Sequence, residues 1–323
     1  MKVSVIIPTY NREGLIKFTL DSLKTNLHPG IDLEVIVIDD GSTDNTLTVI
    51  SNNYPEVTLL KNSGKGTPAA RNTGLAAATG KYVCYLDSDD LIGEQFFNSK
   101  IAYMEQHVDT DACYGAYEYF ESDGAFSIEQ IMFKHKYPMY TDSTRYAHEH
   151  MVNYLSGSYL PANCIVWRRD FVLKCKGHDI NMLINQDVEL FVRSIFNGLR
   201  IIAINDKTSV YIRKHSLDTR VGDPGNASVK WQQILQLRKR IHADLKKQSF
   251  EDDDCLKALS TFLFNYWKML RHSEPAIAAE YLEFAKKVYW PVPAKGNVAY
   301  RMLATLLGPV RATELKYSLL KRD

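Results

Sequence analysis

The chain of 323 residues is long enough to bury a large core and to form one large domain or two. Its residues are 45% hydrophobic and 24% charged, as in an ordinary soluble protein, and the net charge of +1 gives no reason to expect nucleic acid as a partner. The five cysteines are scattered and form no Cys-x-x-Cys pair, which argues against a disulfide framework or a zinc site and indicates a reducing compartment.

The first hundred residues alternate between strand and helix patterns. Strands are expected where short apolar, β-rich runs occur, over residues 3–7, 33–38, 57–60 and 81–86. Helices are expected between them, over residues 15–23, 46–53 and 68–79. Strands that are apolar throughout and are separated by helices predict a parallel sheet covered on both faces.

The rest of the chain changes character twice. Further strands are expected over residues 113–120, 159–167, 200–204 and 209–213, with an amphipathic helix over 185–197. Residues 121–156 are rich in Tyr, His and Lys, and we expect an irregular loop there over the site. From about residue 226 the pattern is helical, and a last helical segment follows the Pro291-Val-Pro293 break.

An apolar strand runs directly into the segment Asp87-Ser88-Asp89-Asp90. The carboxyl end of such a strand lies at the ligand crevice of an open α/β sheet. Carboxylates gathered there repel one another unless a cation lies between them, which suits a divalent metal that also carries a phosphate oxygen. Taken alone, the segment fits an ordinary Asp-rich turn equally well.

Two other strand ends carry candidate ligand residues. Asp39 and Asp40 follow a buried strand, and both are surplus to helix capping because Asp44 alone could provide it. An Asp at this edge can accept an N–H from a base such as uracil. The first strand ends in Pro8-Thr9-Tyr10-Asn11, whose backbone and Tyr ring could flank a base or ribose. Asp187 opens a helix, where a plain N-cap is the default interpretation.

These segments, together with Ala70-Arg71-Asn72-Thr73-Gly74, resemble the motifs of the family 2 glycosyltransferases over roughly residues 2–215. The resemblance implies an inverting enzyme with a GT-A fold, a Rossmann-like nucleotide-sugar-binding domain with a mostly parallel mixed sheet. It implies a catalytic domain over residues 1–222, with a nucleotide-sugar half over about 1–110 and an acceptor half over about 111–222. A helical C-terminal extension would cover residues 223–323.

The resemblance also implies a role for each matching residue. The residues expected to bind the nucleotide are Pro8, Thr9, Tyr10, Asp39, Asp40, Arg71, Asp87 and Ser88. Asp40 would accept the uracil N3–H, and Asp87-Ser88-Asp89 would be the DXD motif. Asp89 would bind Mn²⁺ or Mg²⁺ directly, with Asp87 nearby and His215 as a further candidate ligand. Asp187 would be the catalytic base.

The chain departs from the family pattern near the expected base. Most members carry Glu-Asp where this chain has Gln186-Asp187, so the base is retained while the preceding carboxylate is not. The loop before it, which usually reads Gly-aromatic-Asp, is Gly177-His178-Asp179 here. His215 lies in a segment where a His can approach the metal or the diphosphate, and a structural role for it is equally consistent.

The reaction implied is transfer of a sugar from a UDP-sugar to a hydroxyl of a glycan or lipid-linked oligosaccharide, in bacterial surface polysaccharide or lipopolysaccharide synthesis. Three alternatives remain. The segment Ser63–Ala69 matches G-x-G-x-x-A, an outline of a dinucleotide site, but it follows the third strand instead of the first. A nucleotidyltransferase acting on a sugar phosphate would normally carry a basic Gly-rich loop after the first strand. A non-catalytic nucleotide-binding protein would not need its acids intact.

The sequence predicts a cytoplasmic protein. The apolar run Val3–Ile7 is too short for a signal peptide, and no run reaches the roughly 18–20 apolar residues of a membrane span. Residues 297–322 are basic and amphipathic, which suits peripheral contact with an anionic membrane. Packing on the catalytic domain or contact in a homodimer would be the commoner use of such a face.

Overall fold

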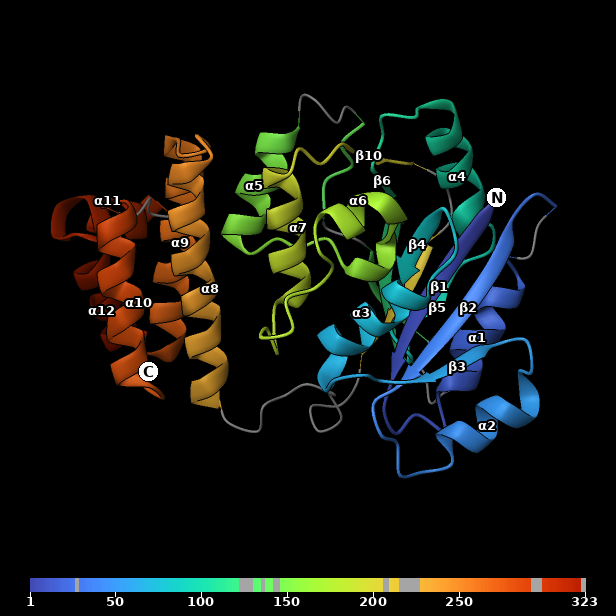
Figure 1. Ribbon diagram of the computed structural model, residues 1–323. Coiled ribbons are helices and arrows are strands. Elements are labelled where there is room, and N and C mark those ends of the chain that lie inside the picture. The colour runs from blue at the N-terminus through green and yellow to red at the C-terminus, as the bar shows by residue number, and fades with distance from the viewer. Residues whose placement is uncertain are drawn as a thin grey trace. The chain divides into compact units, whose positions relative to one another are not determined.

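The computed structural model describes residues 1–26, 29–121, 130–134, 137–141, 146–205, 209–214, 227–291 and 298–320 (Figure 1). The chain divides into two compact units. The first comprises Met1–Ala147 and Tyr159–Asp223, and the second comprises His148–Ser158 and Pro224–Asp323. The first unit contains the predicted α/β fold, and the second is helical.

The first unit is built from short strands joined by helices. Its strands are β1 (Lys2–Thr9), β2 (Asp32–Asp39), β3 (Thr58–Lys61), β4 (Tyr82–Tyr85), β5 (Leu91–Ile92), β6 (Ala112–Tyr114), β7 (Ala116–Glu121), β8 (Gln130–Lys134), β9 (Ile165–Arg168), β10 (Ile201–Ala203) and β11 (Ser209–Arg213). Its helices are α1 (Ile16–Lys24), α2 (Thr46–Asn53), α3 (Gly66–Ala77), α4 (Phe96–Gln106), α6 (Arg169–Lys174) and α7 (Gln186–Phe196), with the 3-10 turn η1 (Ala162–Cys164).

A seven-stranded sheet in the order β10-β6-β9-β4-β1-β2-β3 forms the centre of this unit. Strand β1 runs parallel to β2 and to β4, with Val5 opposite Val35 on one side and Cys84 on the other. Strand β9 is antiparallel to both of its neighbours, β4 and β6. The predicted α/β class with a mostly parallel mixed sheet is therefore confirmed, and the carboxyl ends of β1, β2 and β4 meet at one edge.

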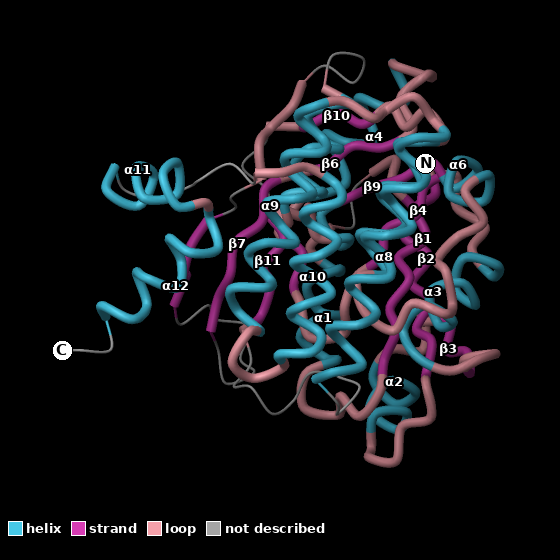
Figure 2. The backbone as a smooth tube through the Cα atoms, turned by 90° about the vertical axis from the view of Figure 1, so that its left-hand side faces the viewer, coloured by secondary structure: helices cyan, strands magenta, loops and turns pink. Residues whose placement is uncertain are grey.

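Helices cover both faces of this sheet. Figure 2 shows α1 on one side of β1 and β2 and α3 on the other. Helix α3 lies very close to the strands, because a Cβ placed on Gly74 would be 2.4 Å from Ile6 Cγ2 and 2.7 Å from Ile38 Cδ1. Ile6 and Ile38 are themselves fully buried. This close packing fixes how far Arg71, on the same helix, lies from the strand ends.

A smaller sheet in the order β5-β11-β7-β8 completes the first unit. The prediction of a single strand over residues 113–120 is wrong, because this segment forms two strands. Strand β6 belongs to the large sheet and β7 belongs to the small one. The break falls at Gly115, whose N–H donates to Cys164 O at 3.1 Å instead of continuing a ladder. A Cβ at Gly115 would lie 2.9 Å from Lys100 Cε, so a larger residue would require the end of the Lys100 side chain to move.

Residues 121–156, expected to be irregular, contain regular structure at both ends. Strand β8 pairs antiparallel with β7, and α5 (Ala147–Ser156) begins the last third of the segment. The strand expected over 159–167 is shorter than predicted, because η1 precedes β9. Local composition misled the prediction here, since tertiary pairing with β7 and packing of α5 supply the stabilisation that the sequence pattern lacks.

The second unit is a group of helices that includes α5. The others are α8 (Ala227–Lys247), α9 (Asp253–Leu270), α10 (Pro275–Val288), α11 (Val298–Leu307) and α12 (Pro309–Leu320). Its core contains the fully buried Arg238, whose guanidinium lies 4.2 Å from the ring centroid of Phe262. Within the described ranges, no helix combines the length and apolar character that crossing a bilayer requires.

Candidate active site

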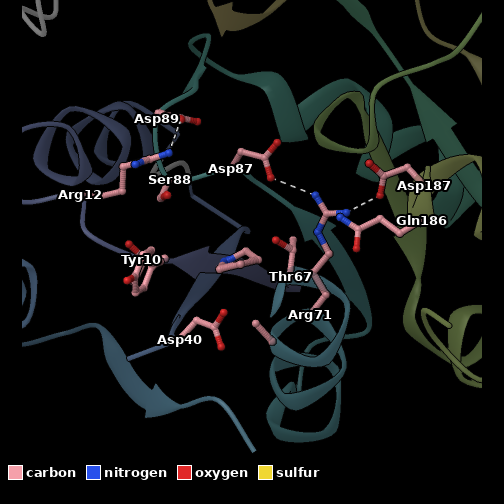
Figure 3. A pocket seen from close by; sticks show the side chains of 13 residues that line it. Tyr10, Arg12, Asp40, Thr67, Arg71, Asp87, Ser88, Asp89, Gln186 and Asp187 are labelled. Carbon is pink, nitrogen blue, oxygen red and sulfur yellow. Dashed lines mark hydrogen bonds and ion pairs between the residues drawn. The ribbon is translucent and has the colours of Figure 1, made fainter. Parts of the chain in front are cut away.

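A pocket opens at the carboxyl edge of the large sheet, and all of its lining residues belong to the first unit. They are Pro8, Thr9, Tyr10, Arg12, Asp40, Thr67, Ala70, Arg71, Asp87, Ser88, Asp89, Gln186 and Asp187. Figure 3 shows the charged and polar side chains converging on this space from the ends of β1 and β4, from α3 and from the start of α7. The structure thus brings together nearly all residues that the sequence motifs marked as candidate site residues.

One end of the pocket is formed where β1 and β2 finish. Asp40 N–H donates to Thr9 O at 2.9 Å, so the two strand ends are held in register. The Asp40 carboxylate accepts Gly66 N–H at 2.9 Å and Asn62 Nδ2 at 2.7 Å. Gly66 has φ +81°, a conformation that favours glycine, and this lets its N–H point back at Asp40. Asp40 therefore faces the pocket while holding the loop that leads into α3.

Asp39 differs from the expectation, because its side chain does not line the pocket. Its carboxylate accepts the N–H groups of Gly41 at 3.0 Å and Ser42 at 3.1 Å. Asp39 is only 7% exposed. The structure gives it the role of bracing the turn after β2, which the sequence pattern did not distinguish from ligand binding.

Arg71 bridges two carboxylates that the sequence assigned to different roles. Its Nη2 donates to Asp87 Oδ1 at 2.9 Å, and its Nη1 donates to Asp187 Oδ1. The Arg71 side chain is only 3% exposed, whereas those of Asp87 and Asp187 are 48% and 37% exposed. A buried guanidinium with two donors in a fixed fork is suited to hold two acids in a set relation.

These charges shift the ionisation of both carboxylates. The buried surroundings of Asp187 would raise its pKa, but Arg71 and then His178 outweigh this effect and lower it to about 2. The buried surroundings raise the pKa of Asp87, and the charges of Asp89 and Asp187 add to this against the opposing effect of Arg71. Asp187 is therefore ionised at neutral pH, while Asp87 is crowded by like charge.

The three acids after β4 have separate environments. Asp89 pairs with Arg12, whose Nη2 lies 3.3 Å from Asp89 Oδ2, and sequence reasoning gave Arg12 no role. Asp90 is not among the pocket-lining residues and is buried, with its carboxylate accepting Asn163 Nδ2 at 2.6 Å and Arg213 N–H at 2.8 Å. Burial raises the pKa of Asp90 well above its usual range, and Asp89 and Asp87 add to the shift.

Gln186 begins α7 and Asp187 is its second residue, and both line the pocket. Asn185, the residue just before the helix, has φ +56°, a left-handed conformation that sets the direction in which α7 starts. Asn185 is the N-cap residue and Asp187 lies inside the first turn of α7, where an acid is favourable, so Asp187 is not the N-cap itself. His178 approaches the same carboxylate, with Nε2 3.5 Å from Asp187 Oδ1.

The acids Asp87 and Asp89 fit a divalent cation. They are oxygen donors, they lie on one loop at the pocket wall, and like charge raises the pKa of Asp87, a repulsion that a cation would relieve. The third candidate ligand, His215, lies outside the described residues.

Another potential metal-ligand group among the described residues is His148, Asp252 and Cys255 in the helical unit. Asp252 already caps α9 by accepting Cys255 N–H at 2.8 Å, and its other oxygen lies 2.6 Å from His148 Nε2. Both carboxylate oxygens are thus used within the fold.

Comparison with known proteins places these motifs in context. The sequence profile described as Glycosyl transferase family 2 matches residues 4–170, just over half of the chain. The "Uncharacterized glycosyltransferase YibD" of Escherichia coli (strain K12) is 28% identical over 263 residues, which cover 75% of this chain and 72% of that protein.

Two further similarities differ in extent. The Poly(ribitol-phosphate) beta-glucosyltransferase of Bacillus spizizenii is 42% identical over 101 residues, covering 29% of this chain and only 16% of that much longer protein. The crystal structure of Staphylococcus aureus TarS 1-349 in complex with UDP-GlcNAc has a TM-score of 0.68 and 21% identity, covering 100% of this chain and 93% of that one. The second similarity establishes a shared fold.

Proposed function

The chain belongs to glycosyltransferase family 2, and we propose that it is a metal-dependent inverting enzyme that moves a sugar from a UDP-sugar to a glycan hydroxyl. The observation that carries this proposal is one pocket in which Asp40, Asp87, Asp89 and Asp187 converge from three separate segments, the ends of β2 and β4 and the start of α7. Only tertiary folding brings Asp187 to acids a hundred residues earlier in the chain, and it does so at the ligand edge of the sheet.

The nucleoside would bind at the end of the pocket formed by β1 and β2. Tyr10 is 38% exposed there, so its ring is available to a base or ribose. Asp40 would accept the uracil N3–H, although its carboxylate already accepts two hydrogen bonds, because an ionised carboxylate has about four acceptor positions. Similarity of fold to a protein solved with UDP-GlcNAc supports a UDP-sugar as the donor.

The diphosphate would lie near the loop after β4. Asp87 and Asp89 would hold Mn²⁺ or Mg²⁺, which when bound neutralises the charge that develops on the leaving diphosphate. Arg12 and Arg71 line the same wall and would add positive charge near the phosphate oxygens. The pairing of these arginines with the two acids keeps all four groups oriented toward the pocket.

Asp187 would be the general base. Its carboxylate is 37% exposed toward the pocket, so an acceptor hydroxyl can reach it. The carboxylate would take the hydroxyl proton as the oxygen attacks the anomeric carbon from the face opposite the diphosphate, a contribution of roughly 10²–10⁴-fold. A single displacement inverts that carbon, so an α-linked donor would give a β-linked product.

The acceptor we propose is a growing bacterial surface polysaccharide. The support is the similarity to the poly(ribitol-phosphate) beta-glucosyltransferase, which is 42% identical over 101 residues. We assign the catalytic role to residues 1–222, because every residue that lines the pocket lies there.

A panel of nucleotide sugars incubated with Mn²⁺ tests the proposal, with release of each free nucleotide as the readout. We expect Mn²⁺-dependent release of UDP from one donor, and its loss when chelator is added. Asp187→Asn should abolish transfer while retaining UDP binding by calorimetry. Release of pyrophosphate instead of UDP would point to a nucleotidyltransferase and contradict the proposal.

A further inference from the structure

His178 is a buried imidazole close to the proposed base. Its side chain is 0% exposed, and within the described residues neither Nδ1 nor Nε2 has a hydrogen-bond partner. A buried polar group without a partner costs free energy of folding, so its retention calls for an explanation.

The polar atom in reach of the ring is a carboxylate oxygen. Nε2 of His178 lies 3.5 Å from Asp187 Oδ1, a few tenths of an ångström beyond a normal hydrogen bond. On its other side the ring meets Tyr85 edge-on, with the centroids 4.8 Å apart. Packing against Tyr85 therefore limits how the imidazole can turn and keeps Nε2 directed at Asp187.

The backbone that carries His178 is fixed from two helices. Asn72, next to Arg71 on α3, donates to His178 O and accepts His178 N–H, both at 2.8 Å. Arg193 on α7 donates to Gly177 O at 2.8 Å. Gly177 has φ +62°, and a Cβ there would lie 2.4 Å from Asn72 Oδ1. The ring position is thus determined by the fold and not by a loose loop.

The surroundings of the His178 ring favour its neutral form, which can still donate one N–H. Burial lowers the pKa of His178, and the charges of Arg71 and Arg193 act in the same direction against that of Asp187. The ring is faced by Asp187 and Arg193 from α7, Arg71 from α3 and Tyr85 from β4. A neutral imidazole carries one N–H, and on Nε2 that proton points at a carboxylate.

We propose that His178 is a positioning residue for Asp187: Nε2–H donates to Oδ1 and holds the carboxylate so that Oδ2 faces the acceptor hydroxyl. Among the described residues, Arg71 and His178 both approach the same oxygen of Asp187, Oδ1. Two donors on one oxygen fix the rotation of the carboxylate and leave the other oxygen to the substrate. This inference rests on the proposed role of Asp187 as the base.

A matched pair of variants tests the proposal. His178→Phe keeps a ring against Tyr85 and removes the donor, whereas His178→Gln places an N–H close to the position of Nε2. We expect His178→Phe to lower kcat on the order of tenfold, as loss of a hydrogen bond to a charged group does, with the donor KM unchanged. His178→Gln should recover most of that loss.

The pH profile gives a readout that loss of packing alone would not move. Arg71, His178, Asp87 and Tyr85 are the titratable or charged groups that face Asp187. His178 favours the ionised carboxylate, so in His178→Phe the acidic limb of kcat should shift to higher pH. Unchanged kcat and an unchanged limb in His178→Phe would overturn the proposal.

Nitrogen NMR of the histidine ring tests the contact without any substrate. We expect the Nε2–H tautomer for His178 in the wild-type protein and a changed Nε2 shift in Asp187→Asn. The Nδ1–H tautomer, or no response to Asp187→Asn, would rule out the contact. If Asp187→Asn instead retained full transfer activity while the NMR response was present, the assignment of the base would fail and the contact would stand.

Discussion

The guanidinium of Arg71 donates to the carboxylate of Asp187, a residue 116 positions further along the chain. This contact links the helix after β3 to the helix that carries the proposed base. Because Arg71 also binds Asp87, the proposed base and the proposed metal site share one cation. In the proposed reaction, the groups that would serve departure of the diphosphate and activation of the acceptor therefore contact the same buried side chain.

Replacing Arg71 tests how far the fold depends on that cation. Arg71→Met leaves the like charges of Asp87 and Asp187 unopposed, and we expect the free energy of unfolding to fall by roughly 2 kcal/mol, below the cost for a fully buried pair because both acids are partly exposed. Arg71→Lys should lie between, since an ammonium lacks the fork. Urea denaturation measures both.

Arg200 provides the control for that experiment. It forms an exposed pair with Asp109, with side chains 47% and 64% exposed. Arg200→Met should therefore cost under about 1 kcal/mol. Equal losses in the Arg71 and Arg200 variants would contradict a special role for Arg71.

The ionisation of Asp187 predicts a pH dependence of stability. Its pKa is about 2 in the folded protein and about 3.9 in an unfolded chain. A lowered pKa means that the ionised carboxylate stabilises the fold above pH ~4 and that this contribution is lost as pH falls toward ~2. The difference in unfolding free energy between wild type and Asp187→Asn should therefore shrink over that window.

Urea titrations at a series of pH values measure that difference. Glu56→Gln, at an exposed position, serves as the control and should give a small difference at every pH. A gap between wild type and Asp187→Asn that stays constant down to the lowest pH would show that the carboxylate gains nothing from its neighbours.

The acids Asp89 and Asp90 should separate function from stability. We expect Asp89→Asn to reduce metal-dependent UDP release on the order of 10²-fold, because its side chain lines the pocket, and to affect folding only by weakening its ion pair with Arg12. Asp90→Asn should lower the free energy of unfolding by about 1–3 kcal/mol, since an amide cannot accept from both Asn163 and Arg213. Turnover and thermal melting of each variant, measured side by side, decide between these roles, and the reverse pattern would contradict them.

The exposed apolar residues of helix α11 lead us to predict contact with an anionic membrane surface. Met302 and Leu306 are 62% and 77% exposed, and the basic residues Arg301, Arg311 and Lys316 are exposed in the same helix pair, which Figure 2 labels α11 and α12. We expect Met302→Ser with Leu306→Ser to reduce sedimentation with vesicles that contain phosphatidylglycerol, because both apolar burial and charge attraction contribute.

The matched control is Val108→Ser, since Val108 is 80% exposed in the other unit. Vesicles of phosphatidylcholine alone should bind less of the wild-type protein. Unchanged sedimentation of the double variant would contradict the membrane interpretation. If size exclusion showed a wild-type dimer that the double variant fails to form, the same face would be assigned to self-association.

The first four strands and three helices were predictable because each depends on local pattern. Apolar runs such as Val35–Ile38 form buried strands wherever a parallel sheet is covered on both faces. The division of residues 113–120 between two sheets was not predictable, because it depends on the contact between Gly115 and Cys164. No sequence period records a partner fifty residues away.

The site shows the same limit. Motif order predicted that Asp87, Asp89 and Asp187 lie at one site, and all three line the pocket; Asp39, predicted there too, instead accepts hydrogen bonds from the turn after β2 and is not among the lining residues. The ion pair of Arg12 with Asp89 was missed because an Arg beside a strand end carries no local signal. The departure at His178 was visible in the sequence, but its nearness to Asp187 required the folded chain.

One turn of α3 carries three residues with different partners. Arg71 binds Asp87 and Asp187, Asn72 binds the backbone of His178, and Gly74 packs against the sheet. One residue added or removed ahead of this turn would rotate all three by about 100° about the helix axis. Insertions and deletions between Gly66 and Gly74 should therefore be far more damaging than most single substitutions there. The length of this segment, as much as the identity of its residues, limits how the sequence of such a protein can change during evolution.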